Sequence, residues 1–122
     1  MAKNNKEIGN LGENIACKYL VKNNFLIIDR NYRKKWGEID IVAIKKGILH
    51  FFEVKSINNN RTYKPEYNVH NIKQRKIKRM IETYLIYKGI DREVHLMFHV
   101  LSIYLNHEKR LAKVSFIENV IL

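Results

Sequence analysis

The sequence contains one cysteine, one proline and no long apolar run. Because Cys17 has no second cysteine to pair with, an internal disulfide is excluded and a reducing compartment is favoured. Pro65 stands alone, and without repeats or low-complexity stretches the sequence indicates no interdomain linker. No segment approaches the ~20 apolar residues of a membrane span, and MAKNNKEIGN lacks the apolar core of a signal peptide. We therefore expect a cytoplasmic protein that does not bind membranes.

Acidic residues are also few. The 122 residues include 12 Asp and Glu against 23 Lys and Arg, which gives a formal net charge of +11. The length of the chain fits one compact domain, residues 1–122, and 46% hydrophobic residues are enough to form its core. Eight basic and two acidic side chains fall within residues 59–90. A positive field concentrated in this way favours a polyanionic partner, with nucleic acid ahead of an anionic membrane.

Hydrophobic periodicity predicts two helices and five strands. The helices are expected at 7–23 and at 69–88, where Gly89 marks the end of the second. Strands are expected at 25–33, 36–45, 48–56, 94–105 and 111–120, with a loop at 58–68. The order αβββαββ predicts a layered α/β (α+β) domain with a mixed central sheet flanked by helices.

The two strands at 36–56 carry four charged side chains within apolar sequence. If residues 46–47 form a two-residue turn, Asp40 lies directly opposite Glu53, and Glu38 directly opposite Lys55. Like charges in directly opposed positions are destabilising. The first of these pairs therefore requires an explanation.

Apolar side chains on both faces of the first strand indicate that both faces are covered. Strict alternation places Ile39, Ile41 and Ala43 on one face, and Val42 and Ile44 on the other. The carboxylates between them are then partly removed from water. Facing carboxylates in that setting need a shared proton, a basic side chain or a metal ion.

Three interpretations of these charges stay open on the residues alone. The first is structural, with a Glu38–Lys55 ion pair and with Asp40 and Glu53 at a wet sheet edge. The second is a carboxylate dyad that shares a proton for acid–base chemistry. The third is a divalent metal site, for which hard oxygen ligands suit Mg²⁺ or Mn²⁺. A lysine beside such a site, on a basic protein, favours phosphodiester hydrolysis.

Four blocks of sequence resemble a known family. Asp40 followed by Glu53-Val54-Lys55 resembles the PD-(D/E)xK signature of restriction-endonuclease-like nucleases. The blocks are similar to those of the YraN-like family, small bacterial proteins predicted to be nucleases: GNLGENIACKYL (9–20), NYRKKWGEIDIVA (31–43), FFEVKS (51–56) and KQRKIKRMIETYL (73–85). Their order and spacing extend over most of residues 9–85.

The resemblance implies roles for individual residues. Asp40 and Glu53 would bind Mg²⁺ or Mn²⁺, and Glu13 would add a third carboxylate to the metal shell. Lys55 would orient or activate the attacking water, or stabilise charge in the transition state. Glu38 would support the site, and we expect it to pair with Lys55.

The sequence departs from the family at two positions. Ile39 stands where the superfamily signature has proline, which is a tolerated change. His99, in Phe98-His99-Val100, replaces the aspartate that the family usually shows. We expect a structural role for His99 because its strand is apolar.

Basic residues outside this pattern are candidates for contact with nucleic acid. On the second helix four of them fall largely off the apolar stripe, and three more precede the hairpin: Arg75, Lys76, Lys78 and Arg79, then Arg33, Lys34 and Lys35. Lys73 lies nearer the apolar stripe and is expected to point toward the site. Trp36 is expected to pack in the core.

Taken together, these features predict a divalent-metal-dependent endonuclease acting on DNA, branched or single-stranded. Junction resolvases share the fold, so the resemblance also implies a structure-selective enzyme or a homodimer. The alternative is a nucleic-acid-binding adaptor of the same fold whose carboxylates have no catalytic role. A small RNA-binding or ribosome-associated protein is a third alternative.

Overall fold

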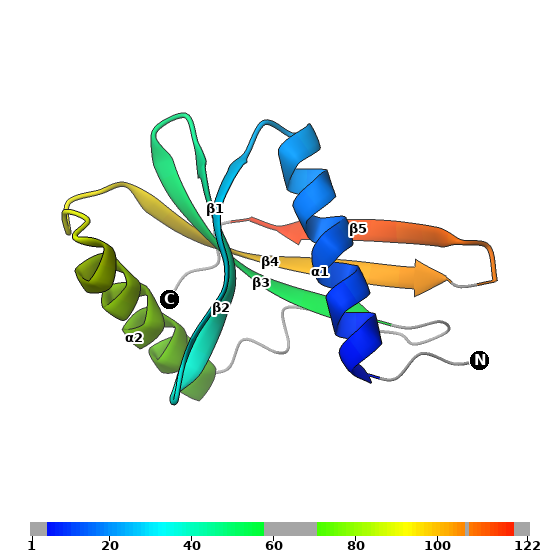
Figure 1. Cartoon of the computed structure of the whole chain (residues 1–122), viewed down its shortest axis with the longest axis horizontal. Helices are drawn as coiled ribbons and strands as arrows, with labels where there is room; N and C mark the ends of the chain where they lie inside the picture. Colours follow the sequence, from blue (N-terminus) through cyan, green and yellow to red (C-terminus); the bar gives the residue numbers. More distant parts are fainter. Residues whose placement is uncertain (1–4, 58–70, 107, 119–122) are drawn as a thin grey trace.

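The computed structural model describes residues 5–57, 71–106 and 108–118 (Figure 1). Its seven elements follow the predicted order: α1 (Asn5–Lys22), β1 (Leu26–Lys34), β2 (Gly37–Lys45), β3 (Ile48–Ile57), α2 (Asn71–Lys88), β4 (Leu96–Asn106) and β5 (Leu111–Ile117). The loop expected at 58–68 lies outside the described residues. The predicted fold class, an α/β domain with a mixed sheet, is confirmed.

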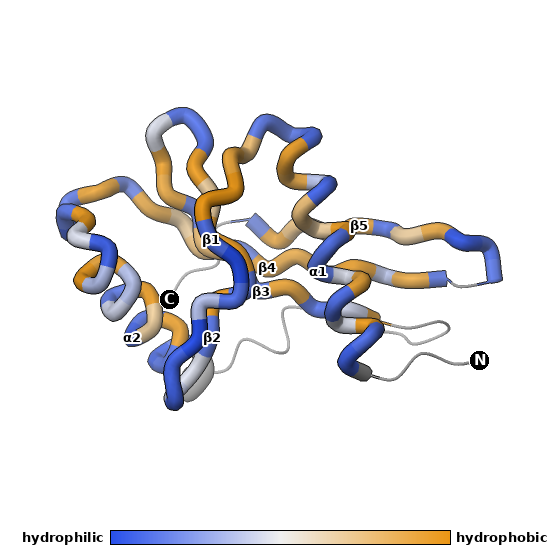
Figure 2. Tube along the Cα trace, viewed as in Figure 1, coloured by the Kyte–Doolittle hydropathy of each residue, from blue (hydrophilic) through white to orange (hydrophobic). Residues whose placement is uncertain are grey.

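The five strands form one sheet in the order β1-β2-β3-β4-β5. The β3–β4 pair is parallel, and the other three pairs are antiparallel. A parallel pair needs a long crossover connection, and α2 lies within the one that joins β3 to β4. Figure 2 shows that β3 and β4 are hydrophobic over most of their length, as expected for strands at the centre of a sheet.

The turn between β2 and β3 sets the register of the hairpin. Lys46 and Gly47 have φ angles of 52° and 75°, and two positive values are what a type I′ turn requires. The paired residues run from Lys45–Ile48 to Ile41–Phe52. The predicted two-residue turn and its register are therefore confirmed over these pairs.

The helices cover opposite faces of the sheet. Ala16 and Leu20 of α1 pack in one core cluster with Ile41 and Phe52, whereas α2 packs in another with Val42 and Phe51. Adjacent residues of each strand thus enter different cores, which confirms that both faces are buried.

Strict alternation fails at one residue of β2. Ile39 belongs to the cluster on the α2 side, although Ile41, two residues further, belongs to the cluster on the α1 side. The expected shared face of these residues is therefore wrong. The change occurs where the β2–β3 pairing ends, although Ile39 is still paired with Tyr32 of β1.

The second helix ends as the sequence predicts. Gly89 has a φ of 65°, and the Ile90 backbone N–H donates to the Leu85 carbonyl at 2.8 Å. This pattern is a Schellman cap, in which a left-handed residue closes the last turn. No helix within the described residues has the length and hydrophobicity to cross a membrane.

Candidate functional site

An acidic cleft of about 430 Å³ lies between α1, β2 and β3. The four residues predicted to be catalytic all line it, and so do two of the predicted supporting and basic residues: Glu13, Asp40, Glu53 and Lys55, then Glu38 and Arg33. Side chains that are far apart in the sequence, on a helix and three strands, therefore line one cleft.

Asp40 occupies the point where β2 and β3 separate. The last paired residues are Ile41 and Phe52, and one of the next N–H groups of β3, that of Val54, donates to the Asp40 Oδ2 at 2.7 Å. A carboxylate oxygen thus takes the place that a backbone carbonyl has within a ladder. The pairing ends one residue before Asp40 and Glu53 would stand directly opposite each other.

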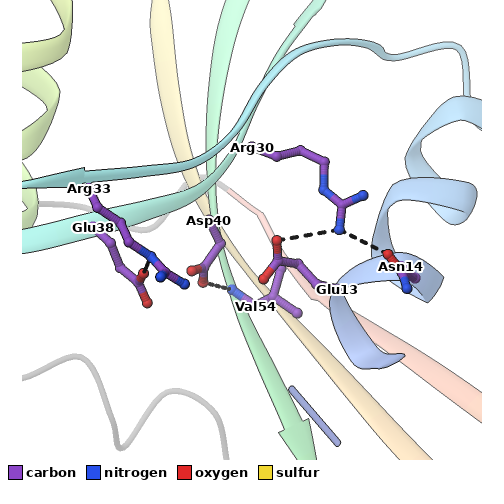
Figure 3. Close-up of polar contacts among 7 residues, drawn as sticks. All are labelled: Glu13, Asn14, Arg30, Arg33, Glu38, Asp40 and Val54. Atoms are coloured by element: carbon purple, nitrogen blue, oxygen red, sulfur yellow. Dashed lines mark hydrogen bonds and ion pairs between the residues drawn. The ribbon is translucent and has the colours of Figure 1, made fainter. Parts of the chain in front are cut away.

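Burial and negative charge together raise the pKa of Asp40. Desolvation is the largest cause, the carboxylates of Glu38, Glu13 and Glu53 add to it, and the Val54 N–H acts in the opposite direction. The resulting pKa is about 7, against an ordinary value of 3.8. Figure 3 shows the Asp40 side chain between those of Glu38 and Glu13. The cleft is therefore a site of accumulated negative charge.

Lys55 and Glu53 form an ion pair on β3. The Lys55 Nζ lies 3.1 Å from the Glu53 Oε1, with the two side chains 28% and 17% exposed. A cation is thus fixed beside the carboxylates, as the sequence interpretation requires. The partner of Lys55 is therefore Glu53 and not the expected Glu38.

Glu38 forms its ion pair with Arg33 and not with Lys55, the partner predicted from the sequence. The Arg33 Nε donates to the Glu38 Oε2 at 2.8 Å (Figure 3). These two residues are direct cross-strand partners in the β1–β2 ladder. The expected pairing with Lys55 required the β2–β3 ladder to continue two residues past Ile41, and the strands separate before that.

Close packing of α1 on β3 places Glu13 at the cleft. A side chain at Gly12 would collide with the Ser56 hydroxyl, and its Cβ would lie 2.8 Å from the Ser56 Cβ. Only glycine permits this approach. The Glu13 side chain, 14% exposed, is turned inward beside Asp40.

Arg30 is a site residue that the sequence interpretation missed. Its Nη2 lies 3.5 Å from the Glu13 Oε1 and donates to the Asn14 Oδ1 at 3.0 Å (Figure 3). Arg30 therefore ties the helix that carries Glu13 to the strand β1. The sequence gives a weak signal for it, because an arginine on a strand does not indicate which helix it reaches.

The donor set of the cleft fits a hard divalent cation. Its candidate ligands are carboxylate oxygens, which Mg²⁺ and Mn²⁺ prefer. Burial first, and the neighbouring carboxylates after it, raise the pKa of Asp40, and a cation bound there would favour its charged form. As the side chains stand, no three His, Cys, Asp or Glu residues of the described segments are close enough to hold one ion together. Asp40, Glu53 and Glu13 would therefore have to turn toward a common point.

The predicted basic residues whose side chains the structure describes lie at the surface, and of these Arg33 alone lines the cleft. Those before the hairpin and those of α2 are exposed: Arg33, Lys34, Lys35, Arg75, Lys76, Lys78 and Arg79. Lys73 belongs to α2, but its side chain lies outside the described ones. Exposure on α2 agrees with the predicted face, and contact with nucleic acid stays a prediction.

Trp36 does not pack in the core as expected. The residue is 36% exposed, and the Arg79 guanidinium carbon lies 4.3 Å from the ring centroid. Stacking of a guanidinium on an indole gives the ring a favourable cation–π contact while one side of it stays exposed. Trp36 and Arg79 thus form part of the surface beside α2.

His99 has the buried environment of a structural residue. It is 0% exposed, and its Nε2 lies 2.8 Å from the Nδ1 of His50 on the neighbouring strand. Aromatic rings of Phe52 and Phe116 pack around it. Its surroundings agree with the structural role expected from the sequence.

An α/β domain whose mixed sheet carries an acidic cleft on its hairpin is consistent with a restriction-endonuclease-like core. Residues 12–105 match the family described as "Uncharacterised protein family UPF0102". The chain belongs to this family, which is the YraN-like group indicated by the motifs.

Its relatives match nearly the whole chain. UPF0102 proteins of Clostridium botulinum (strain Alaska E43 / Type E3) and Clostridium beijerinckii are 38% and 39% identical over 119 residues, covering 98% of this chain and 97% and 96% of theirs. A UPF0102 protein of Campylobacter lari is 39% identical over 116 residues, covering 95% of this chain and 100% of its own. The similarity thus includes every element that lines the cleft.

Proposed function

We propose that this protein is a Mg²⁺- or Mn²⁺-dependent endonuclease that hydrolyses phosphodiester bonds in branched or single-stranded DNA. The observation that carries the proposal is the cleft itself. Three carboxylates and a lysine line it from three elements: Glu13, Asp40, Glu53 and Lys55. The basic surface of α2 and the net charge of +11 supply attraction to the polyanionic substrate.

Each residue of the cleft has a role in this proposal. Asp40 and Glu53, with Glu13, would hold the ion, whose Lewis acidity activates water and screens the phosphate. Lys55, positioned by Glu53 at 3.1 Å, would stabilise negative charge on the phosphate and orient the nucleophilic water. Arg33, held by Glu38, would contact a neighbouring phosphate through its exposed guanidinium.

Cleavage assays on plasmid, single-stranded and four-way-junction DNA test the proposal. With Mg²⁺ or Mn²⁺ present, we expect cleavage by the unaltered protein and a loss of about 100-fold or more in Asp40→Asn, Glu53→Gln and Lys55→Gln. Glu108→Gln removes an exposed carboxylate from the turn before β5 and is the matched control, for which we expect unchanged cleavage. Cleavage that survives Asp40→Asn would contradict the proposal.

Thermal unfolding gives a second readout for the metal. A ligand that binds only the folded state stabilises it by RT ln(1 + [L]/Kd), so Mg²⁺ or Mn²⁺ should raise the unfolding midpoint of the unaltered protein. The same ion should have little effect on Asp40→Asn. An equal rise in both proteins would place the ion elsewhere on the surface.

A nucleic-acid-binding adaptor is the second candidate function. Ion pairs favour it: Glu38, Glu53 and Glu13 each have a basic partner within 3.5 Å, so the cleft carries its own counter-charges. The adaptor predicts DNA or RNA binding without cleavage, unchanged by the three cleft substitutions. Comparison of DNA and RNA affinity at matched salt separates these two partners.

Location and assembly belong to the same proposal. The cytoplasm contains the DNA that the enzyme would act on. Symmetric cutting of a four-way junction needs two clefts, so an enzyme of that kind would act as a homodimer. Light scattering of the protein with and without junction DNA measures this directly.

A further inference from the structure

A second pocket, of about 170 Å³, adjoins the acidic cleft on its α2 side. It shares Glu38, Asp40 and Glu53 with the cleft, and its remaining walls come from β2, β3, β4 and α2. The proposed hydrolysis uses the shared carboxylates and leaves these other walls without a role.

The walls of this pocket are mostly apolar. Ile39, Phe52, Ile77, Met80 and Phe98 line it, and Gly37 closes against Met80, whose Cγ would lie only 3.1 Å from a Cβ at that position. One group at the wall is basic, the exposed Lys76 of α2. Because three carboxylates also line it, the pocket suits a group with apolar faces and polar edges, and Lys76 can contact an anion attached to that group.

Volume limits the occupant to a single small group. A water molecule takes about 30 Å³ of liquid, so about 170 Å³ holds several water volumes. Sites for drug-sized ligands are larger, roughly 300–1,000 Å³. One nucleobase fits these limits, whereas a base pair does not.

Further basic and aromatic side chains lie next to the pocket along α2. Lys76 and Arg79 are three residues apart and therefore share one side of the helix. Arg79 holds its guanidinium 4.3 Å from the centroid of the exposed Trp36 ring. A cation at the pocket and a stacked cation–aromatic pair beyond it are what an unpaired nucleic-acid strand meets in sequence-independent binding sites.

We propose that this pocket receives the unpaired base of the nucleotide next to the phosphate held in the cleft, with Lys76 contacting the adjoining backbone. The inference rests on the proposed function, because it uses the cleft to place the phosphate. It deepens that function by narrowing the substrate class to DNA in which the nucleotide at the cut position is unpaired. A continuous duplex would have to flip a base out of its stack to fill the same pocket.

Methionine resonances test the proposal without any cleavage. The chain has three methionines, of which Met80 lines the pocket and Met97 does not. In protein with labelled methionine methyl groups, in chelator-containing buffer, we expect a short single-stranded oligodeoxynucleotide to shift the Met80 methyl resonance through the ring current of a base. The Met97 resonance, and the Met80 resonance with an abasic oligonucleotide of the same length, should stay in place.

Pocket-filling variants supply a binding readout. Ile77→Phe extends a ring into the pocket, and Ile86→Phe, at a position of the same helix that is 66% exposed, is the matched control. We expect Ile77→Phe to weaken binding of the single strand by roughly five-fold or more, the effect of losing one stacked base. It should bind the abasic strand as the unaltered protein does. If Ile77→Phe does not fold, Lys76→Gln takes its place, with Lys109→Gln at an exposed position away from the pocket as its control.

The outcomes separate this inference from the proposed function. A Met80 resonance that stays in place when the protein is saturated with oligonucleotide, or that moves equally with the abasic strand, overturns the inference even if DNA is cleaved with metal. A base-dependent shift of Met80, together with no cleavage of any DNA, supports the pocket and overturns the nuclease. Failure to bind single-stranded DNA at all overturns the inference.

Discussion

His50 and His99 form a buried pair on the two central strands. Their nearest ring nitrogens are 2.8 Å apart, so one ring donates and the other accepts, and the two residues are only 7% and 0% exposed. Burial lowers the pKa of both, and the neighbouring His50 adds to the shift that brings the pKa of His99 to about 4. The position where the family usually shows an acid therefore holds a neutral ring in this chain.

This pair predicts a loss of stability in mild acid. A histidine whose pKa is 6.5 when unfolded and about 4 when folded binds a proton more readily in the unfolded state. Stability should therefore be fully present above pH 6.5 and fall as pH decreases toward 4, by about 1–3 kcal/mol from this residue. Urea unfolding at a series of pH values measures it.

Two variants isolate the contribution of His99. His99→Gln keeps a polar partner for His50 and should flatten the acid limb of the stability curve. His95→Gln removes an exposed histidine that directly precedes β4, and it should leave the stability curve unchanged. A curve for His99→Gln that coincides with that of the unaltered protein would show that the pair does not govern acid stability.

At the scale of elements, the contact between α1 and β3 decides where Glu13 lies. The helix approaches the strand so closely at Gly12 that a methyl group there would meet the Ser56 Cβ at 2.8 Å. Overpacking of this kind forces the backbone to shift. Because Glu13 follows Gly12 directly, a shift of α1 moves a carboxylate of the cleft.

Gly12→Ala should therefore destabilise the protein and impair the site together. We expect a loss of about 1–3 kcal/mol in the free energy of unfolding, and reduced cleavage if the proposed function holds. Ser56→Gly in the same protein removes the opposing side chain and should restore part of the loss, as a double-mutant cycle would show. Gly9→Ala is the control, because nothing lies within 4 Å of a Cβ at that position. Equal effects of Gly9→Ala and Gly12→Ala would show that the loss of stability comes from replacing a helical glycine and not from contact with Ser56.

For the whole molecule, the dominant property is the excess of positive charge. The net charge is +11, and four exposed basic residues follow one stretch of α2: Arg75, Lys76, Lys78 and Arg79. Phosphate contacts release counterions, so affinity for a single strand falls with salt by a slope of about 0.7 per contact. The slope therefore counts all phosphate contacts of the protein, and substitutions on α2 find the share of the helix.

Replacing two of these residues gives a measurable change. Arg75→Gln with Lys78→Gln should weaken binding to all sequences alike and reduce the salt slope by about 0.7 for each lost contact. Lys109→Gln with Lys113→Gln removes the same charge from exposed positions at the β4–β5 end and should leave the slope nearly unchanged. Equal effects of the two double variants would mean that only net charge matters.

Local patterns in the sequence predicted most of the fold. The Lys46-Gly47 turn, the Gly89 helix end and the alternation of Phe51 and Phe52 each depend on neighbours in the chain, and each is confirmed. The gathering of Glu13 with Asp40 came from family resemblance rather than from spacing. No local pattern relates a residue of α1 to the hairpin.

The partners of the charged residues were harder to predict. The register was right as far as Ile41–Phe52, but the strands separate there, so Glu38 pairs with Arg33 and not with Lys55. Where the strands separate, the Val54 N–H donates to the Asp40 side chain, a contact that no sequence period encodes. Arg30 was missed for a similar reason: its ion pair with Glu13 forms only when α1 packs on the sheet, and no local pattern predicts that contact.

The parallel pairing of β3 with β4 also has a consequence for the order in which the site forms. A tight hairpin closes in about 1–10 μs, whereas pairing across a long crossover carries a larger loop-closure entropy and is slower. Asp40 and Glu53 are on the same hairpin and are brought near each other by its short turn. Glu13 and Lys76 join only when α1 and α2 dock. The Asp40–Glu53 part of the site is thus a local structure, whereas the addition of Glu13, the pocket and the basic wall depends on long-range folding.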